Sequence, residues 1–167
     1  VGAGSAVPFS VIATDALPDL HVTGAGSGGQ FFPRWTYEPL DSTGAQGALD
    51  LGDRNAVIVD GHRRIDNVTD AALAEYRAAY GPDVTKDDVF FYVYGLLHSP
   101  DYRQTFAADL KKMLPRIPKV AGVEDFRVFV AAGRELADLH IGYEAVVPWP
   151  GLTVTGLEPT GPGAGDR

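Results

Sequence analysis

The feature that most constrains the fold is a change of periodicity near Asn67. Before that residue, short β-branched segments are separated by glycine and proline, a pattern typical of strands. After it, apolar residues recur at helical spacing. The sequence therefore predicts an α+β fold, with an irregular β-rich N-terminal half followed by a cluster of about four helices. The expected strands are Phe9–Thr14, Leu20–Thr23 and Phe31–Tyr37, and a loop over 38–55 leads into the apolar run 56–59.

Local signals mark the ends of the first two expected helices. The first should stop at Gly81-Pro82, because proline cannot continue a helix. The second should begin near Thr85, which forms a capping box with Asp88 three residues later. Their apolar faces hold Leu73, Tyr76 and Tyr80 in the first helix, and Val89, Phe90, Val93, Leu96 and Leu97 in the second.

Two further helices are expected after residue 98. Ser99 suits an N-cap and Pro100 the first helical position, where the missing N–H costs nothing. This third helix should end at the Leu114–Pro118 segment, and a long fourth helix should run from Val123 to about Tyr143. The third helix is expected to bury Tyr102, Phe106, Leu110, Met113 and Leu114.

The expected organisation is one α+β domain over residues 1–147, with its helical part at 67–144. Residues 148–167 are rich in proline and glycine and poor in apolar groups, and so predict a flexible tail. The chain begins at Val1 without a methionine, and we expect a piece of a longer polypeptide.

Composition excludes several classes of protein. A formal net charge of −8 argues against nucleic-acid binding by bulk electrostatics, so any DNA contact must be local. The chain has no cysteine, which rules out disulfides and cysteine-type zinc sites and favours a cytoplasmic location. No apolar run approaches the roughly 20 residues that span a bilayer, so no membrane partner is expected.

Motifs for cofactors are weak. Gly24–Gly29 fits G-x-G-x-x-G, but Gln30–Pro33 follows it where a phosphate-binding loop needs a helix, so we interpret it as a flexible turn. No Gly-Lys pair occurs, which excludes an ATP-binding P-loop. The histidines are far apart in sequence and lack metal-ligand spacing, so the sequence predicts neither catalytic residues nor a metal or cofactor site. These histidines are His21, His62, His98 and His140.

Two groups of basic residues are candidates for DNA contact. The first combines guanidinium groups with an aromatic residue, as contacts to base edges or sugar-phosphate require. The second is a local excess of positive charge suited to phosphate. The alternative for both is ordinary solvated charge beside a buried tryptophan. The candidates are Arg34, Trp35, Arg63 and Arg64 in the first group, and Arg103, Lys111, Lys112 and Arg116 in the second, which also includes Lys119.

Several stretches together carry a family resemblance. They are Thr14–His21, Gly28–Arg34, Asn67–Asp70, Phe91–Arg103, Phe106–Lys112 and Leu114–Pro118. These stretches resemble the C-terminal specificity region of Type ISP single-polypeptide restriction-modification enzymes, and the similarity extends from about Phe9 to Glu144.

The resemblance implies a non-catalytic part of a bacterial defence protein that helps to recognise a site on double-stranded DNA. It also implies that nuclease, ATP-dependent translocase and adenine N6-methyltransferase parts lie upstream in the same polypeptide. S-adenosylmethionine, ATP and Mg would then serve those parts, and this segment would hold no cofactor.

Two rival functions remain. In the first, the chain is an interaction module that holds the methyltransferase and recognition parts together without touching DNA, and it would expose an apolar patch. In the second, the chain is a small enzyme that uses the Gly24–Gly29 loop, and it would bind S-adenosylmethionine or a nucleotide by itself.

Overall fold

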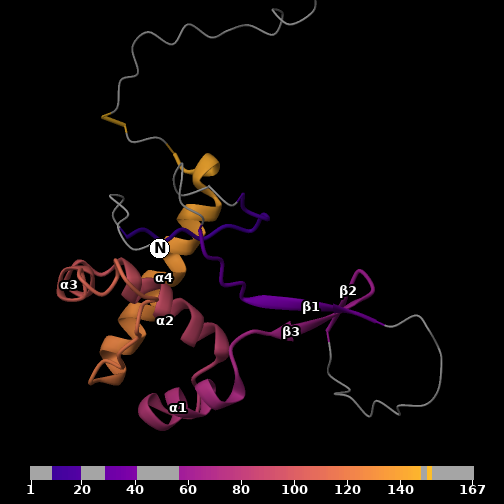
Figure 1. The fold of residues 1–167 in the computed structure, drawn as a ribbon, viewed down its shortest axis with the longest axis horizontal. Coiled ribbons are helices and arrows are strands. Elements are labelled where there is room, and N and C mark those ends of the chain that lie inside the picture. Colours follow the sequence, from indigo (N-terminus) through magenta and orange to yellow (C-terminus); the bar gives the residue numbers. More distant parts are fainter. Residues whose placement is uncertain (1–8, 20–28, 41–56, 148–149, 152–167) are drawn as a thin grey trace, which may run out of the picture.

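The structure is a computed structural model that describes residues 9–19, 29–40, 57–147 and 150–151. A small sheet precedes a group of helices, which confirms the predicted α+β class (Figure 1). The expected tail over 148–167 falls almost entirely outside the described residues. The strands are β1 (Trp35–Pro39), β2 (Ile58–Val59) and β3 (His62–Asp66), and the helices are α1 (Asp70–Tyr80), α2 (Lys86–His98), α3 (Pro100–Thr105), α4 (Val123–Ile141) and the 3-10 turn η1 (Tyr143–Ala145).

The sheet is antiparallel, with strand order β1-β3-β2. A two-residue turn at Asp60 and Gly61 connects β2 to β3, and both residues have positive φ (49° and 74°). Asp-Gly is favoured in such hairpin turns because both residues tolerate this backbone conformation. The sequence analysis missed β3, which has little apolar alternation, although the Asp-Gly pair was a signal for the hairpin.

The strand predictions at the N-terminus were partly wrong. Phe9–Thr14 forms no strand. Its polar backbone groups pair with side chains of the helices, since the N–H of Ala13 donates to the Tyr94 hydroxyl at 2.8 Å. The strand expected at Phe31–Tyr37 begins later, at Trp35, after the proline at position 33. The strand expected at Leu20–Thr23 and the glycine-rich turn lie outside the described residues, except Gly29.

The starts of the first three helices follow their capping signals. The Thr69 side chain accepts the N–H of Ala72 at the start of α1. Thr85 and Asp88 form the predicted reciprocal capping box at the start of α2. Ser99 caps α3, with proline in its first turn. Helix α4 begins at Val123 as predicted, and its first turn carries two carboxylates.

The third helix is shorter than predicted. It ends at Thr105 and passes into successive turns over 106–112. Phe106 leaves helical geometry with φ −103° and ψ 16°. The turns direct Leu110 into the core (3% exposed) and the next residues outward. Met113 and Leu114, expected to be buried, are therefore exposed.

The closest helix packing is between α2 and α4, at two glycines. A Cβ on Gly133 would lie 2.0 Å from the carbonyl oxygen of Phe91, and one on Gly95 would lie 2.4 Å from that of Phe129. Neither position has room for a side chain, so the two backbones meet directly.

Aromatic rings from α1, α2 and α4 form the centre of the core. Tyr80 stacks on Phe126 with ring centroids 4.3 Å apart, and Tyr92 lies 5.0 Å from the same ring. The tyrosine hydroxyls reach the irregular segment after α3, because Tyr80 donates to the carbonyl of Val120 at 2.8 Å and Tyr92 to that of Pro118 at 2.6 Å. The core therefore fixes a segment that has no secondary structure of its own.

The N-terminal segment is held against α2 and α4 by a cluster of ring side chains. The hydroxyl of Tyr94 is hydrogen-bonded to His140, and it also accepts the backbone N–H of Ala13. The Nε2 of His98 lies 3.1 Å from the carbonyl oxygen of Val11. Burial, with His98 nearby, lowers the pKa of His140. Two histidines that are distant in sequence thus meet at this contact.

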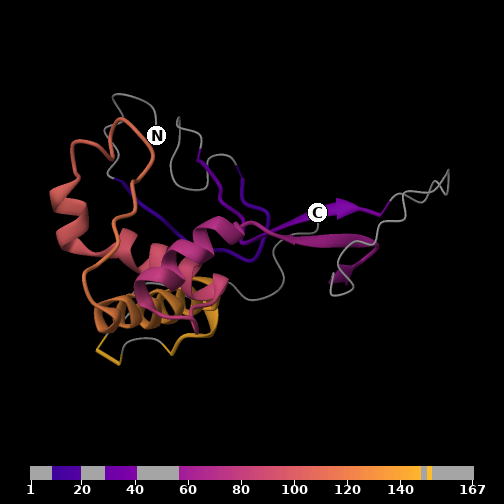
Figure 2. The same ribbon diagram turned by 90° about the horizontal axis from the view of Figure 1, so that it is seen from below.

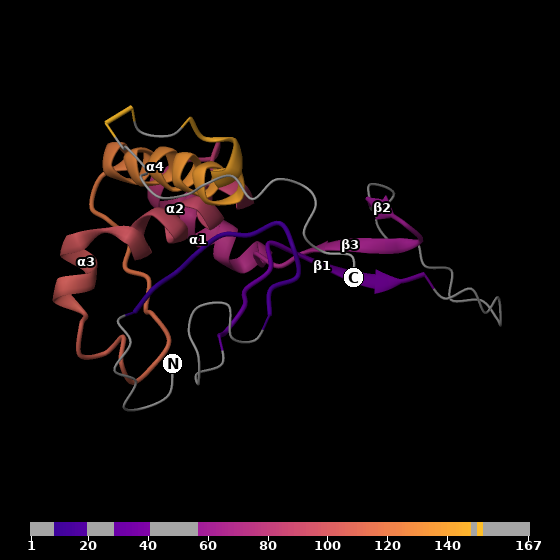
Figure 3. The same cartoon turned by 90° about the horizontal axis from the view of Figure 1, so that it is seen from above.

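The sheet extends away from the helices, as Figure 2 and Figure 3 show from two sides. Within the described residues, no helix packs on either of its faces. No helix among these residues is long and apolar enough to cross a membrane.

The glycine contact predicts a large loss of stability in Gly133→Ala. Alanine favours a helix by about 1 kcal/mol, but its Cβ must displace the backbone of α2, and we expect a net loss of about 2 kcal/mol or more. Urea unfolding measures this. Gly122→Ala is the control, since its Cβ would meet only Asp125 at 3.5 Å and should cost less than about 1 kcal/mol. Equal losses in the two variants would contradict the packing argument.

The buried tyrosines predict unfolding at alkaline pH. Burial raises the pKa of Tyr92 from its ordinary value of 10.0 to about 12, and it raises that of Tyr76 as well. The unfolded chain therefore loses these protons first, so stability is full below about pH 10 and falls between about pH 10 and 12, by up to about 1.4 kcal/mol per pH unit for each group. Urea unfolding across this range should detect the fall, which should be smaller in Tyr92→Phe.

Candidate nucleic-acid interface

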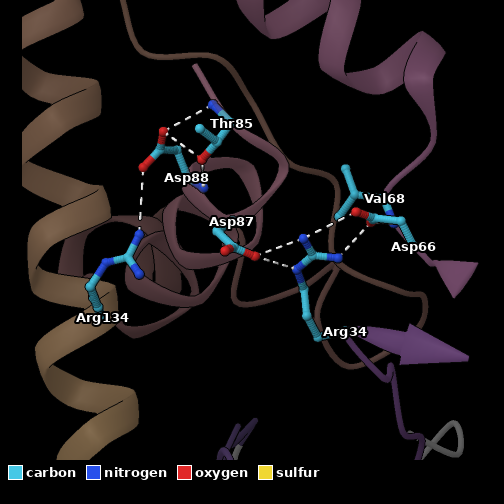
Figure 4. Close-up of polar contacts among 7 residues, drawn as sticks. All are labelled: Arg34, Asp66, Val68, Thr85, Asp87, Asp88 and Arg134. Carbon is cyan, nitrogen blue, oxygen red and sulfur yellow. Dashed lines mark hydrogen bonds and ion pairs between the residues drawn. The ribbon is translucent and has the colours of Figure 1, made fainter. Parts of the chain in front are cut away.

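A partly buried arginine joins the base of the sheet to the start of α2. The guanidinium of Arg34 forms a bidentate contact with Asp66, at 2.5 and 3.2 Å, and its Nε donates to Asp87 at 2.8 Å (Figure 4). The Arg34 side chain is only 13% exposed. Its charge is therefore already matched by two carboxylates, and its donors are occupied within the chain.

Further polar contacts fix the same junction. Asp66 also accepts the N–H of Val68 at 3.0 Å, and the Asn67 side chain donates to the carbonyl of Pro33 at 2.7 Å. The sequence gives no sign that Asp66 and Asp87 are the partners of Arg34, because these contacts span 32 and 53 residues.

The other carboxylate at this helix start, Asp88, holds α2 to α4. It completes the capping box and lies 3.6 Å from Arg134 of α4 (Figure 4). It also lies 3.5 Å from Arg127. Its side chain is 13% exposed. The N-terminal end of α2 is thus fixed on two sides, toward the sheet by one aspartate and toward α4 by the next.

The guanidinium groups of two arginines lie over the indole ring of Trp35. That of Arg34 lies 3.8 Å from the centroid of the indole ring, and that of Arg64 lies 4.1 Å from it. The predicted combination of arginine and aromatic side chains is therefore brought together at one place. Within the described residues, Arg64 forms no ion pair, so its charge is not matched by a carboxylate as that of Arg34 is.

Arg63 has a different environment from its neighbour. Its guanidinium pairs with Glu38 across the strands at 3.1 Å, and both side chains are partly exposed. Such an exposed ion pair contributes about 0–1 kcal/mol to stability. Because successive residues of a strand point to opposite faces, Arg63 and Arg64 lie on different faces of the sheet.

The second basic group also contains one residue that is bound within the fold and others that are exposed. Arg103 is half-buried and donates to the carbonyl of Leu97 at 2.7 Å, so it satisfies a backbone carbonyl in the last turn of α2. Lys111, Lys112 and Arg116 are exposed, and among the described residues none of them forms an ion pair. Arg116 lies on the irregular segment that the tyrosine hydroxyls hold, since Tyr102 also donates to its carbonyl at 2.7 Å, whereas Lys111 and Lys112 lie in the turns just before that segment.

The two basic groups do not form one site. In Figures 1, 2 and 3 the helix α3, which leads into the second group, lies at one end of the longest axis and the sheet at the other. Any single ligand that meets both groups must therefore be long.

Comparison with known proteins decides the family. The Type ISP C-terminal specificity domain matches residues 1–165. The chain belongs to this family. The specificity domain is also similar to a chain in the cryo-EM structure of a DrdV–DNA complex, with 40% identity and a TM-score of 0.50. That match covers 56% of this chain and 9% of the DrdV chain, so the specificity domain spans a small part of the protein that it resembles. No curated protein matches.

The described part of the specificity domain contains no group of three or more histidine, cysteine, aspartate or glutamate side chains that is placed to bind a metal ion. His98 and His140 are near one another, with ring centroids 5.6 Å apart, but they serve the contact with the N-terminal segment. His62 is exposed beside the hairpin turn, and His21 lies outside the described residues.

The contrast between Arg34 and Arg64 predicts different losses of stability. Arg34→Ala leaves two carboxylates without their partner, and we expect the free energy of unfolding to fall by about 2–3 kcal/mol. Arg64→Ala removes the same stacking on Trp35 but no ion pair, and should cost less than about 1 kcal/mol. Urea unfolding of the two variants makes the comparison. A loss in Arg64→Ala as large as that in Arg34→Ala would contradict the assignment of Arg34 as the structural arginine.

Proposed function

We propose that this specificity domain recognises double-stranded DNA for a Type ISP restriction-modification enzyme and catalyses no reaction itself. One observation carries the proposal, namely the 40% identity to a chain whose structure contains bound DNA. The family assignment supports it. We further propose a single domain over residues 1–147 with a flexible tail at 148–167.

The DNA contacts are assigned to the basic residues that the fold leaves available. Arg116 projects from a segment held by tyrosine hydroxyls, Lys111 and Lys112 project from the turns just before it, and all three would neutralise phosphates. In the sheet, the contacts are assigned first to Trp35 and Arg64 on one face, and second to Arg63 on the other face, where it also pairs with Glu38. Arg34 donates to Asp66 and Arg103 donates to the carbonyl of Leu97, so we assign both a structural role and not a DNA contact.

The acidic composition is compatible with this function. Two local basic surfaces can face phosphate while the other surfaces, which give the chain its net charge of −8, face solvent or the rest of the polypeptide. The nuclease, translocase and methyltransferase parts, with S-adenosylmethionine, ATP and Mg, are assigned upstream of this domain. The whole enzyme would act in the bacterial cytoplasm.

A second candidate function is an interaction module within the same polypeptide. It is favoured by the exposed apolar run Val57–Val59, which lies beside and within β2 and is covered by no helix in the described part of the chain. Such a run is typical of a surface that contacts another protein part. This candidate predicts that the domain has no affinity for DNA at any salt concentration.

Removing the charges of Lys111 and Lys112 tests the DNA function. Lys111→Gln with Lys112→Gln should weaken binding to a labelled duplex, and the slope of log K against log salt should become shallower by up to about 2. Fluorescence anisotropy over a salt titration measures both quantities. The matched control is Arg127→Gln with Arg134→Gln, which removes the same charge from α4 near Asp88.

The control variant should bind DNA with a nearly unchanged slope. Equal changes in both double variants would mean that binding follows net charge and not the basic segment. Absence of salt-sensitive binding by the wild-type domain would remove the DNA function and leave the interaction module.

A further inference from the structure

The sheet presents two chemically different faces. In an antiparallel pair, residues in register point to the same side, and alternate residues along a strand do so too. Tyr37 is in register with Arg64, so these two share a face with Trp35. Glu38 is in register with Arg63 and lies on the other face. One face thus combines aromatic rings with an arginine, and the other carries a neutral ion pair.

The unpaired arginine is on the aromatic face. The nearest carboxylate in that face is Asp66, which is already bound by Arg34 and by the N–H of Val68. The positive charge of Arg64 therefore remains available to an anionic or electron-rich ligand. The side chain of Tyr37 beside it is 50% exposed.

Stacking on Trp35 gives Arg64 a defined orientation. The Cζ atom of its guanidinium lies over the indole ring, 4.1 Å from the ring centroid, so the ring restricts the position of the group that carries the N–H donors. A planar fork fixed in this way loses little conformational entropy when it binds a second planar group. The bidentate partner that suits it in duplex DNA is the O6/N7 edge of guanine in the major groove.

The sheet also has the form that such a contact requires. It extends away from the helices (Figures 2 and 3), and its strands β1 and β3 are paired over five residues each. A β-ribbon of this kind can enter the major groove, whose width is about 12 Å.

We infer that Arg64, oriented by Trp35, reads a guanine in the major groove and so determines part of the sequence specificity. This inference rests on the proposed DNA function and adds one base-reading residue to it. The lysines of the other basic group contribute affinity independent of sequence, whereas Arg64 discriminates between bases.

Selection from a randomised duplex library tests the inference with the full 167-residue chain. The variant is Arg64→Lys, which keeps the charge but cannot form the fork. Its preference for guanine at one position of the selected motif should fall by about tenfold, which corresponds to about 1.4 kcal/mol and lies within the roughly 1–3 kcal/mol of a bidentate contact. The slope against salt should stay unchanged, because no charge is lost. Arg127→Lys, the same change on α4 away from the sheet, should select the wild-type motif.

A second variant tests the orientation. Trp35→Leu keeps Arg64 but removes its stacking surface, and it should weaken the preference at the same position of the motif. Thermal melting of each variant confirms that it is folded. A motif unchanged in both Arg64→Lys and Trp35→Leu would overturn the inference.

Two other outcomes would also overturn it. In the first, Arg64→Lys binds all duplexes equally less well, which identifies a phosphate contact. In the second, the wild-type chain binds DNA in a salt-sensitive manner but selects no motif. The proposed DNA function survives both of these results. Absence of any DNA binding by the wild-type chain would remove the proposed function together with the inference.

Discussion

The direct contact between the backbones of α2 and α4 supports the rest of the structure. Gly95 and Gly133 let the two helices approach so closely that α2 becomes the central element. Its N-terminal end binds the base of the sheet through Asp87, its middle places Tyr92 in the aromatic core, and its C-terminal end continues into the third helix. Every surface considered for DNA contact is therefore positioned, directly or through one neighbour, by this one helix.

The basic segment shows how a core can organise chain that has no regular structure. Residues 114–120 form neither helix nor strand, yet hydroxyls of Tyr80, Tyr92 and Tyr102 hold the backbone of this region. Each hydroxyl satisfies a carbonyl that would otherwise need water, while its ring fills the core. The exposed lysines at 111 and 112 lie in the turns just before this region, next to Leu110, whose side chain is in the core.

Whether a feature could be predicted depended on how far apart in the sequence the interacting residues are. Helix starts were correct because caps such as Thr85 with Asp88 act within three residues. The sheet was largely missed, since strand pairing joins distant segments and β3 has little apolar alternation. The basic candidates were found as residue types, but no local pattern distinguishes Arg34, bound by two distant carboxylates, from Arg64, which binds none in the part of the chain that the structure describes. The early end of α3 was missed because Leu110 turns inward through tertiary packing.

The attachment of the sheet has a consequence for how this domain can evolve. In the described part of the chain, the strands meet the helices through the Arg34 junction and do not share the aromatic core. Substitutions at outward-facing positions such as Tyr37 therefore change what the sheet contacts while the helices keep their packing. A lineage can acquire a new ligand preference by exchanging a few strand residues, without first passing through an unstable intermediate protein.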